Sequence, residues 1–229
     1  MRIANNVEML EIAREQGGVM YPVLVWDDKE VVLVDTGLPG QLELIRAAVE
    51  KAGLSLERIT KIILTHHDID HIGNAKLLKG FGAKILAHEK EVPYVQGDIP
   101  FQKLSKMEER LKDLSPEERA FYERLKSGAV NLTVPVDEVL KDGETLPFCG
   151  GIDVIYTPGH TPGHICLLLK NSNVLITGDA ANITNGTLTG PNPAHTPDMA
   201  QAAESFEKLK RLNPDFIVAY HGGLLKNRM

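Results

Sequence analysis

Residues 62–74 read IILTHHDIDHIGN and place a dense group of polar side chains directly after a short apolar run. The β-branched residues Ile62 and Ile63 favour a buried strand, and a helical pattern resumes after Gly73. The loop between them contains His66, His67, Asp68, Asp70 and His71. Imidazole and carboxylate groups are the usual protein ligands of zinc and related metals. This strand-to-helix loop therefore predicts half of a two-metal site.

Helix capping is the alternative explanation for the acidic residues of this loop. An Asp at the start of a helix accepts hydrogen bonds from free backbone amides. Capping would account for Asp68 or Asp70, but it does not account for three histidines beside them. We therefore favour the metal-binding interpretation.

The length and charge of the chain limit what it can be. A chain of 229 residues can bury a full core, so a single domain over residues 1–229 is expected. The net charge of −6 offers no positive surface for a phosphate backbone, which argues against a nucleic-acid partner and a nuclease. No apolar run has the length of a signal peptide core or a bilayer span, so we expect a cytoplasmic protein without a membrane partner.

The two cysteines agree with that expectation. Cys149 and Cys166 are too few to form a disulfide framework. Cys166 lies within the apolar segment ICLLL and is expected to be a buried apolar residue without an activating partner.

Apolar patterning predicts alternating strands and helices in the first half of the chain. Strands are expected at residues 7–12, 19–26, 31–34, 62–64 and 83–87, and helices at 41–52 and 72–79. Asp35 follows the third strand in the turn VDTG. Two interpretations of Asp35 stay open, because an Asp there could cap the turn or could orient a metal-bound histidine.

Residues 92–134 differ in character and predict a helical insertion. Charged helical segments at 104–114 and 116–126 lie between Pro93, Pro100 and Pro135. The insertion is either a solvated hairpin without chemistry or a lid that shapes a substrate pocket. Its aromatic candidates for substrate contact are Tyr94, Phe101, Phe121 and Tyr122.

The second half repeats the pattern of buried strands that end in polar turns. Strands are expected at 139–140, 152–156, 165–169, 174–176 and 216–220, with a helix from Thr196, as its cap, to residue 212. Besides the turn at Asp35, four buried strands end in a tight turn that carries a His or an Asp, at His66, His160, Asp179 and His221. Strand ends at one sheet edge bring distant residues together, so these four turns are expected to converge.

These residues resemble a known family. The loop at His66 resembles the HxHxDH motif of the metallo-β-lactamase superfamily, the three later turns resemble its later metal-binding motifs in order, and VDTG resembles its early DTG turn. The resemblance implies an α/β fold, the four-layered αβ/βα sandwich of that family, and two divalent metal ions that share Asp179. The other implied ligands are His66, Asp68 and His160 for one ion and Asp70, His71 and His221 for the second.

Asp68 departs from the family pattern, which usually has a second His at that position. In one alternative, Asp68 binds the metal, and its hard oxygen ligand makes the first site more tolerant of manganese or iron. In the other, the loop is shifted and His67 replaces Asp68 as the ligand. We favour Asp68, because a slip of one residue would have to be absorbed before Asp70. His88 and His164 are expected to satisfy buried hydrogen bonds, and His195 is expected to be exposed.

The resemblance implies a metal-dependent hydrolase in which a hydroxide bridging two ions, with zinc expected, attacks a small-molecule ester, lactone or thioester. Asp70 is the expected catalytic residue that orients the water and handles its proton. A phosphodiesterase using the same metal pair is the main alternative, and a redox or oxygen-handling module without hydrolytic activity is the alternative of another class. A homodimer is compatible with the sequence.

Overall fold

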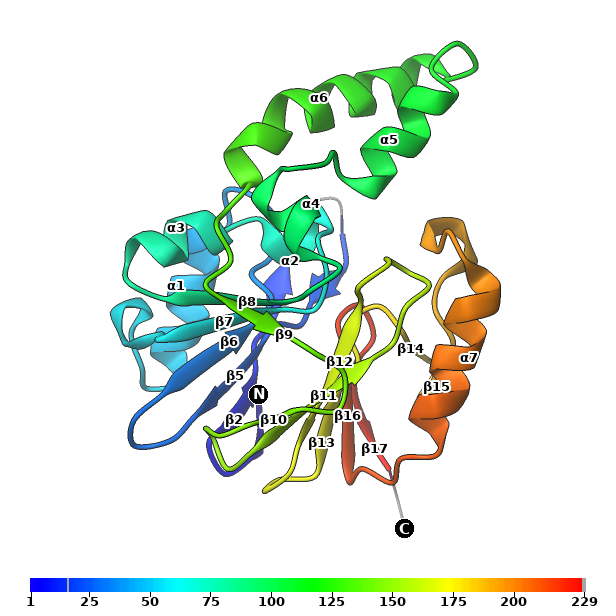
Figure 1. Cartoon of the computed structure of the whole chain (residues 1–229). Coiled ribbons are helices and arrows are strands. Elements are labelled where there is room, and N and C mark those ends of the chain that lie inside the picture. Colours follow the sequence, from blue (N-terminus) through cyan, green and yellow to red (C-terminus); the bar gives the residue numbers. More distant parts are fainter. Residues whose placement is uncertain (16, 228–229) are drawn as a thin grey trace.

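The computed structural model describes residues 1–15 and 17–227. Two large β-sheets face each other, and helices lie on the outer side of each sheet (Figure 1). The α/β four-layered sandwich expected from the sequence is therefore confirmed.

The first sheet is mixed, and its parallel part prepares the functional edge. Its strands, in spatial order, are β1 (Arg2–Ala4), β2 (Val7–Met9), β5 (Val23–Trp26), β6 (Val31–Val34), β7 (Lys61–Leu64), β8 (Lys84–His88) and β9 (Glu138–Leu140). Strands β6 to β9 run parallel to one another. The loops that follow β6, β7 and β8 consequently leave the sheet at the same edge.

The second sheet contributes its own parallel pair. Its order is β10 (Thr145–Leu146), β11 (Ile152–Tyr156), β12 (Ile165–Leu169), β13 (Val174–Ile176), β16 (Phe216–Ala219) and β17 (Gly223–Lys226). Strands β13 and β16 are parallel, so the turns that follow them lie side by side. Two small hairpins, β3 (Ile12–Ala13) with β4 (Val19–Met20) and β14 (Asn182–Thr184) with β15 (Thr187–Thr189), lie outside the large sheets.

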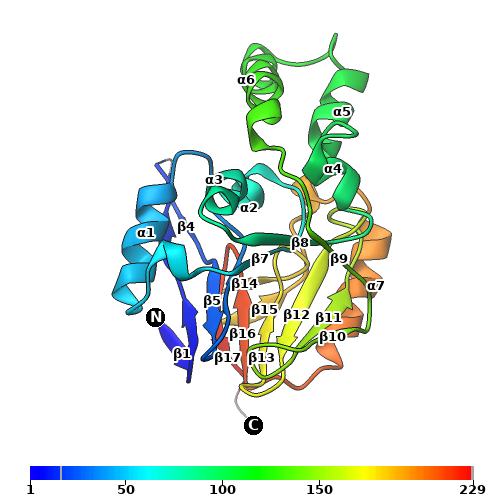
Figure 2. The ribbon, with the colours of Figure 1, turned by 60° about the vertical axis from the view of Figure 1, so that its left-hand side comes forward.

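The helices fall into three groups. The first sheet is covered by α1 (Leu42–Lys51), α2 (Ile69–Ile72) and α3 (Ala75–Gly80), and the second by α7 (Met199–Lys210). The insertion between β8 and β9 forms α4 (Val92–Gln96), α5 (Gln102–Glu109) and α6 (Pro116–Leu132). Short 3₁₀ helices span Leu56–Arg58 and Pro193–His195. Both views show α5 and α6 projecting from one end of the sandwich (Figures 1 and 2).

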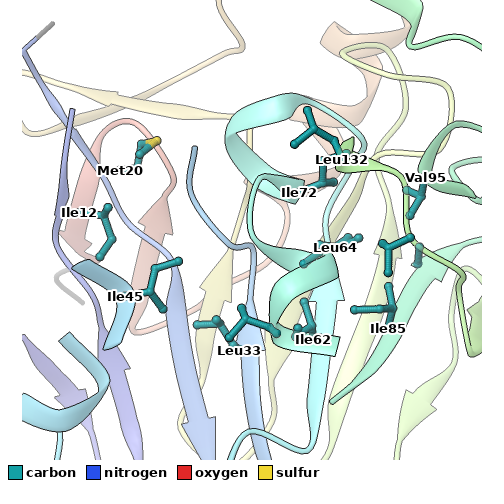
Figure 3. Packing of buried hydrophobic residues seen from close by; sticks show 14 of the residues in the cluster. Ile12, Met20, Leu33, Ile45, Ile62, Leu64, Ile72, Ile85, Val95 and Leu132 are labelled. Atoms are coloured by element: carbon teal, nitrogen blue, oxygen red, sulfur yellow. The ribbon is translucent and has the colours of Figure 1, made fainter. Parts of the chain in front are cut away.

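Alternating side chains divide the buried apolar residues into three layers. On β6, Leu33 points to the layer beneath the helices of the first sheet, whereas Val32 and Val34 point to the layer between the sheets. Figure 3 shows the first of these layers, in which residues from the sheet, α1 and the insertion pack together. A third layer, which includes Cys166 and Leu209, lies between the second sheet and α7. Each large sheet is thus buried on both faces.

Several predicted boundaries are wrong. The strand expected at 19–26 is broken into β4 and β5, because Pro22 has no amide to donate to a ladder. The two insertion helices run over 102–109 and 116–132 instead of 104–114 and 116–126. The last helix begins at Met199 and is capped by Asp198, which accepts a hydrogen bond from the Gln201 amide, and Thr196 is not its cap.

Replacing Gly73 should destabilise the fold. A Cβ at Gly73 would lie 2.3 Å from the carbonyl oxygen of Gly37 and 2.4 Å from the nitrogen of Pro39, which are backbone atoms that cannot move aside. We expect Gly73→Ala to lower the free energy of unfolding by about 1–3 kcal/mol, the usual cost of overpacking. Gly80→Ala is the control, since nothing lies within 4 Å and helical Ala is favoured by about 0.5–1 kcal/mol. Urea unfolding of metal-free protein measures both, and equal effects would contradict this account.

Candidate metal centre

Four strand ends bring the polar side chains together. Strand β7 leads into the loop with His66 and α2, and β11 leads into the turn with His160. The parallel strands β13 and β16 lead into Asp179 and His221. All four turns expected to converge therefore do so, in a cavity of about 810 Å³.

The potential ligand atoms form two groups. In each group these atoms lie within 4.8 Å of one another. The first group is His66, Asp68, His160 and Asp179, and the second is Asp70, His71 and His221. Asp179 lies between the groups, because its Oδ2 is 3.5 Å from His160 Nε2 and 3.4 Å from His221 Nε2.

Hydrogen bonds fix the orientation of three histidine rings. The Thr65 hydroxyl donates to Asp35 Oδ2 at 2.8 Å, so it accepts from His66 Nδ1 at 3.0 Å. His71 Nδ1 donates to the same Asp35 oxygen at 2.9 Å. The Thr196 hydroxyl donates to a backbone carbonyl and accepts from His160 Nδ1 at 3.4 Å. With Nδ1 engaged in each ring, Nε2 presents its lone pair to the centre of the site.

Three of the converging atoms have no hydrogen-bond partner in the described part of the chain. Within the described residues, the buried side-chain atoms without a hydrogen bond include His66 Nε2, His71 Nε2 and Asp179 Oδ1. Lone pairs of imidazole and carboxylate that face one another repel unless a cation lies among them. The donor set is also one that divalent metals prefer. The residues therefore fit a divalent metal site.

Burial and the close approach of neighbouring side chains shift the pKa values of the site residues. Burial, and then the charge of His71, holds the pKa of His66 well below its usual value. Burial alone would lower the pKa of His221, but hydrogen bonds to Asp179 and Asp70 outweigh it and raise the pKa to about 9. Burial alone would raise the pKa of Asp179, yet the charges of His71 and His221 hold it well below its usual value. The carboxylates thus attract positive charge strongly.

The structure places Asp68, not His67, among the grouped atoms. Asp68 Oδ2 is 2.9 Å from His160 Nε2 and 3.3 Å from His66 Nε2. His67 points elsewhere, because its Nδ1 lies 2.5 Å from Glu91 and its ring stacks on Tyr94. The loop has not shifted by a residue.

The remaining histidines lie outside both groups. His164 is buried between the Thr157 hydroxyl, 2.9 Å from Nδ1, and the amide of Asp179, which donates to Nε2 at 3.0 Å. His88 stacks on Tyr156 and accepts from a backbone amide. His195 is exposed at the wall of the cavity. These positions agree with the sequence-based expectations for the three residues.

Sequence reasoning missed four residues around the site. Tyr220 donates to the backbone oxygen of Asp70 at 2.5 Å, and its ring packs on His71. Lys103, on α5, donates to Asp68 Oδ2 at 2.6 Å. The others are Glu91 and Thr196. Tyr220 directly precedes His221, which is the one clue that the chain itself offered for these contacts.

The insertion forms one wall of the cavity. Phe101, Lys103, Phe121 and Leu125 line the same cavity as the ligand residues Asp68, Asp70, His160, Asp179 and His221. Of the other aromatic candidates, Tyr94 packs on His67, and Tyr122 is buried in the hairpin with its hydroxyl donating to Glu108. The insertion is therefore more than a solvated hairpin.

In the described part of the chain, every helix is too short or too polar to cross a bilayer.

The four-layered sandwich, and its cluster of His and Asp side chains that could hold a divalent metal, are those of a metallo-hydrolase. The chain belongs to the metallo-β-lactamase superfamily, whose sequence profile matches residues 20–221. A probable metallo-hydrolase, YflN of Bacillus subtilis, is 33% identical over 206 residues, which cover 83% of this chain and 75% of that protein.

Two further relatives agree with this family. The hydroxyacylglutathione hydrolase GloC of Haemophilus influenzae is 27% identical over 76% of this chain and 71% of its own length. The crystal structure of a metallo-beta-lactamase family protein from Thermus thermophilus matches with a TM-score of 0.76 and 25% identity, over 98% of this chain and 76% of that one.

Metal ions should stabilise the folded protein. A ligand that binds the folded state alone, at about 100 times its Kd, adds about 2.7 kcal/mol. We expect Zn²⁺ or Mn²⁺ to raise the Tm of chelator-treated protein, and Asp179→Asn to lose most of that increase. Asp113→Asn, an exposed change between α5 and α6, is the control. Equal Tm increases in the three proteins would contradict the assignment.

The two thiols should resist alkylation at neutral pH. Burial raises the pKa of Cys166 to about 12, and burial followed by the charges of Asp27 and Glu30 raises that of Cys149 to about 12. The reactive thiolate forms only as the pH approaches these values, so labelling of the folded protein by iodoacetamide should be negligible at pH 7 and increase up to pH 10. Mass spectrometry measures it, and complete labelling of Cys166 at pH 7 would contradict the buried position.

Proposed function

We propose that the chain is a dinuclear metallohydrolase that cleaves an ester, lactone or thioester bond of a small molecule. The observation that carries this proposal is the pair of ligand groups on either side of Asp179 at the floor of one cavity. The residues that would hold one ion are His66, Asp68 and His160, those that would hold the other are Asp70, His71 and His221, and Asp179 would be shared.

Zinc is the metal that we expect, with manganese or iron as alternatives, because Asp68 adds a hard oxygen ligand to the first group. Two such ions supply Lewis acidity, which lowers the pKa of bound water and polarises the substrate carbonyl. The protein orients the groups that surround them. Asp35 fixes His71 through Nδ1, and Thr196 does the same for His160.

Asp70 is the residue to which we assign proton handling. Its side chain is 20% exposed and lines the cavity, with Oδ2 3.3 Å from His221 Nε2. The Tyr220 hydroxyl donates to its backbone oxygen, which restricts the backbone from which this carboxylate of the second group projects. From there it can orient the attacking water, accept its proton and return that proton to the leaving group.

The cavity wall favours a substrate with an apolar acyl part. Phe101, Phe121 and Leu125 of the insertion offer apolar surface, and Lys103 adds one ammonium group beside Asp68. We propose that α5 and α6 act as a lid over this acyl part. Relatives named hydroxyacylglutathione hydrolases make thioesters the first substrate class to test.

Substitutions at the two groups should abolish turnover without unfolding the chain. We expect Asp70→Asn and His160→Ala to lower kcat by orders of magnitude, because the first removes the proton acceptor, a change of about 10²–10⁴, and the second removes a ligand. The measurement is hydrolysis of lactones, thioesters and bis(p-nitrophenyl) phosphate with defined metals, together with circular dichroism.

The substrate panel separates the alternatives. Asp113→Asn should keep normal turnover, since it lies at the exposed junction of α5 and α6. Preference for the phosphate diester would replace the acyl hydrolase with a phosphodiesterase. An intense visible spectrum without any hydrolysis would favour the redox alternative, and near-normal turnover in both site variants would remove the mechanism.

A further inference from the structure

Glu91 is a wholly buried carboxylate outside both ligand groups, between β8 and α4. We propose that Glu91 is a positioning residue for the first metal site, which it holds by tying the loop with His66 and Asp68 to the turn with His160. This inference rests on the proposed function and deepens it. It explains a buried charge that the hydrolytic mechanism leaves unused.

Both oxygens of Glu91 are engaged by donors from two loops. Oε2 accepts from the backbone nitrogen of His67 at 2.9 Å and lies 2.5 Å from its Nδ1. Oε1 accepts from the Thr161 hydroxyl at 2.7 Å and from the Gly163 amide at 2.7 Å. One side chain therefore joins segments that are about a hundred residues apart in sequence.

The chemistry of these contacts requires an ionised carboxylate. A buried carboxylate is costly unless several hydrogen bonds compensate for the water that it loses. The backbone amides of His67 and Gly163 can only donate, and the Thr161 hydroxyl donates as well. A glutamine of the same shape has one accepting oxygen and one NH₂ group, so it would oppose a donor to a donor at one of the two loops.

Two of the three donor residues, His67 and Thr161, are immediate neighbours of ligand residues. His67 lies between His66 and Asp68, and Thr161 follows His160. Fixing these neighbours restricts the backbone from which each ligand side chain projects. The turn also approaches closely, because a Cβ at Gly163 would lie 2.7 Å from the Glu91 nitrogen. In the second group, His71 donates to Asp35 and the backbone oxygen of Asp70 accepts from Tyr220, so Glu91 touches neither residue.

The same contact extends to the insertion. Because His67 Nδ1 donates to Glu91, Nε2 is free to accept, and it lies 3.3 Å from the amide of Gln102 at the start of α5. The His67 ring stacks on Tyr94 of α4, with centroids 4.2 Å apart. The wall of the cavity is thus fixed to the metal loop by the residue that Glu91 orients.

A site-specific metal titration tests this role. We expect Glu91→Gln to weaken binding of one of the two ions by about 10- to 100-fold, the usual effect of losing a group that orients metal ligands, and to leave the other ion unchanged. The measurement is Co²⁺ titration of metal-stripped protein followed by visible absorption, with chelator competition for Zn²⁺. Glu89→Gln is the matched control, since Glu89 is exposed two residues earlier.

Thr161→Val provides a second, milder variant. It removes one donor to Glu91 Oε1 and keeps the shape of the side chain, so we expect a smaller loss of affinity for the same ion. If Glu91→Gln does not fold, this variant decides the question. Wild-type affinity for both ions in the folded variants, or equal weakening of both ions, would overturn the positioning role.

The failure of this inference differs from failure of the proposed function. A wild-type protein that takes up no metal would refute the dinuclear hydrolase, and the role of Glu91 with it. A wild-type protein that binds two ions, beside a Glu91→Gln protein that binds them equally well, would refute the role of Glu91 alone. The pair of titrations therefore assigns the fault.

Discussion

Three carboxylates and four imidazoles converge on a small volume at the joined edges of two sheets, and their lone pairs cannot coexist there without positive charge. That electrostatic demand constrains everything around it. The strands fix the backbone positions of the ligand residues, but the imidazole rings could still rotate about their side-chain bonds. Buried hydrogen bonds from His71 to Asp35 and from His66 to Thr65 remove that freedom for these two rings, so their Nε2 atoms face inward without a bound cation.

The fold can hold these buried charges close together because the apolar packing of the two large sheets stabilises it. Each large sheet is packed on both faces, and the parallel strands end at one level, so displacing one ligand loop would disturb a buried layer. The backbone is also tightly packed beside His71, where Gly73 lies against the turn at Gly37. The positions of the ligand side chains are therefore fixed by apolar packing that takes no part in the chemistry.

The parts of the site that sequence could predict are local in the chain. Ligands grouped in one loop, or placed directly after an apolar strand, leave a pattern, and the resemblance to a known family then ordered the distant ones. Glu91 and Lys103 left no pattern, because their partners lie 24 to 72 and 35 residues away. Thr196 resembled a helix cap by its position before a proline, but it orients His160, and Asp198 takes the capping role. Thr and Asp are both common helix caps, so residue type alone did not show that Asp198 caps the helix and that Thr196 contacts His160.

The ion pair between Lys103 and Asp68 gives the insertion an electrostatic connection to the floor of the cavity, over 2.6 Å. A divalent cation that bound the first group would therefore compete with the Lys103 ammonium group for Asp68 Oδ2. Through this contact, the position of α5 would be coupled to the charge of the first ligand group.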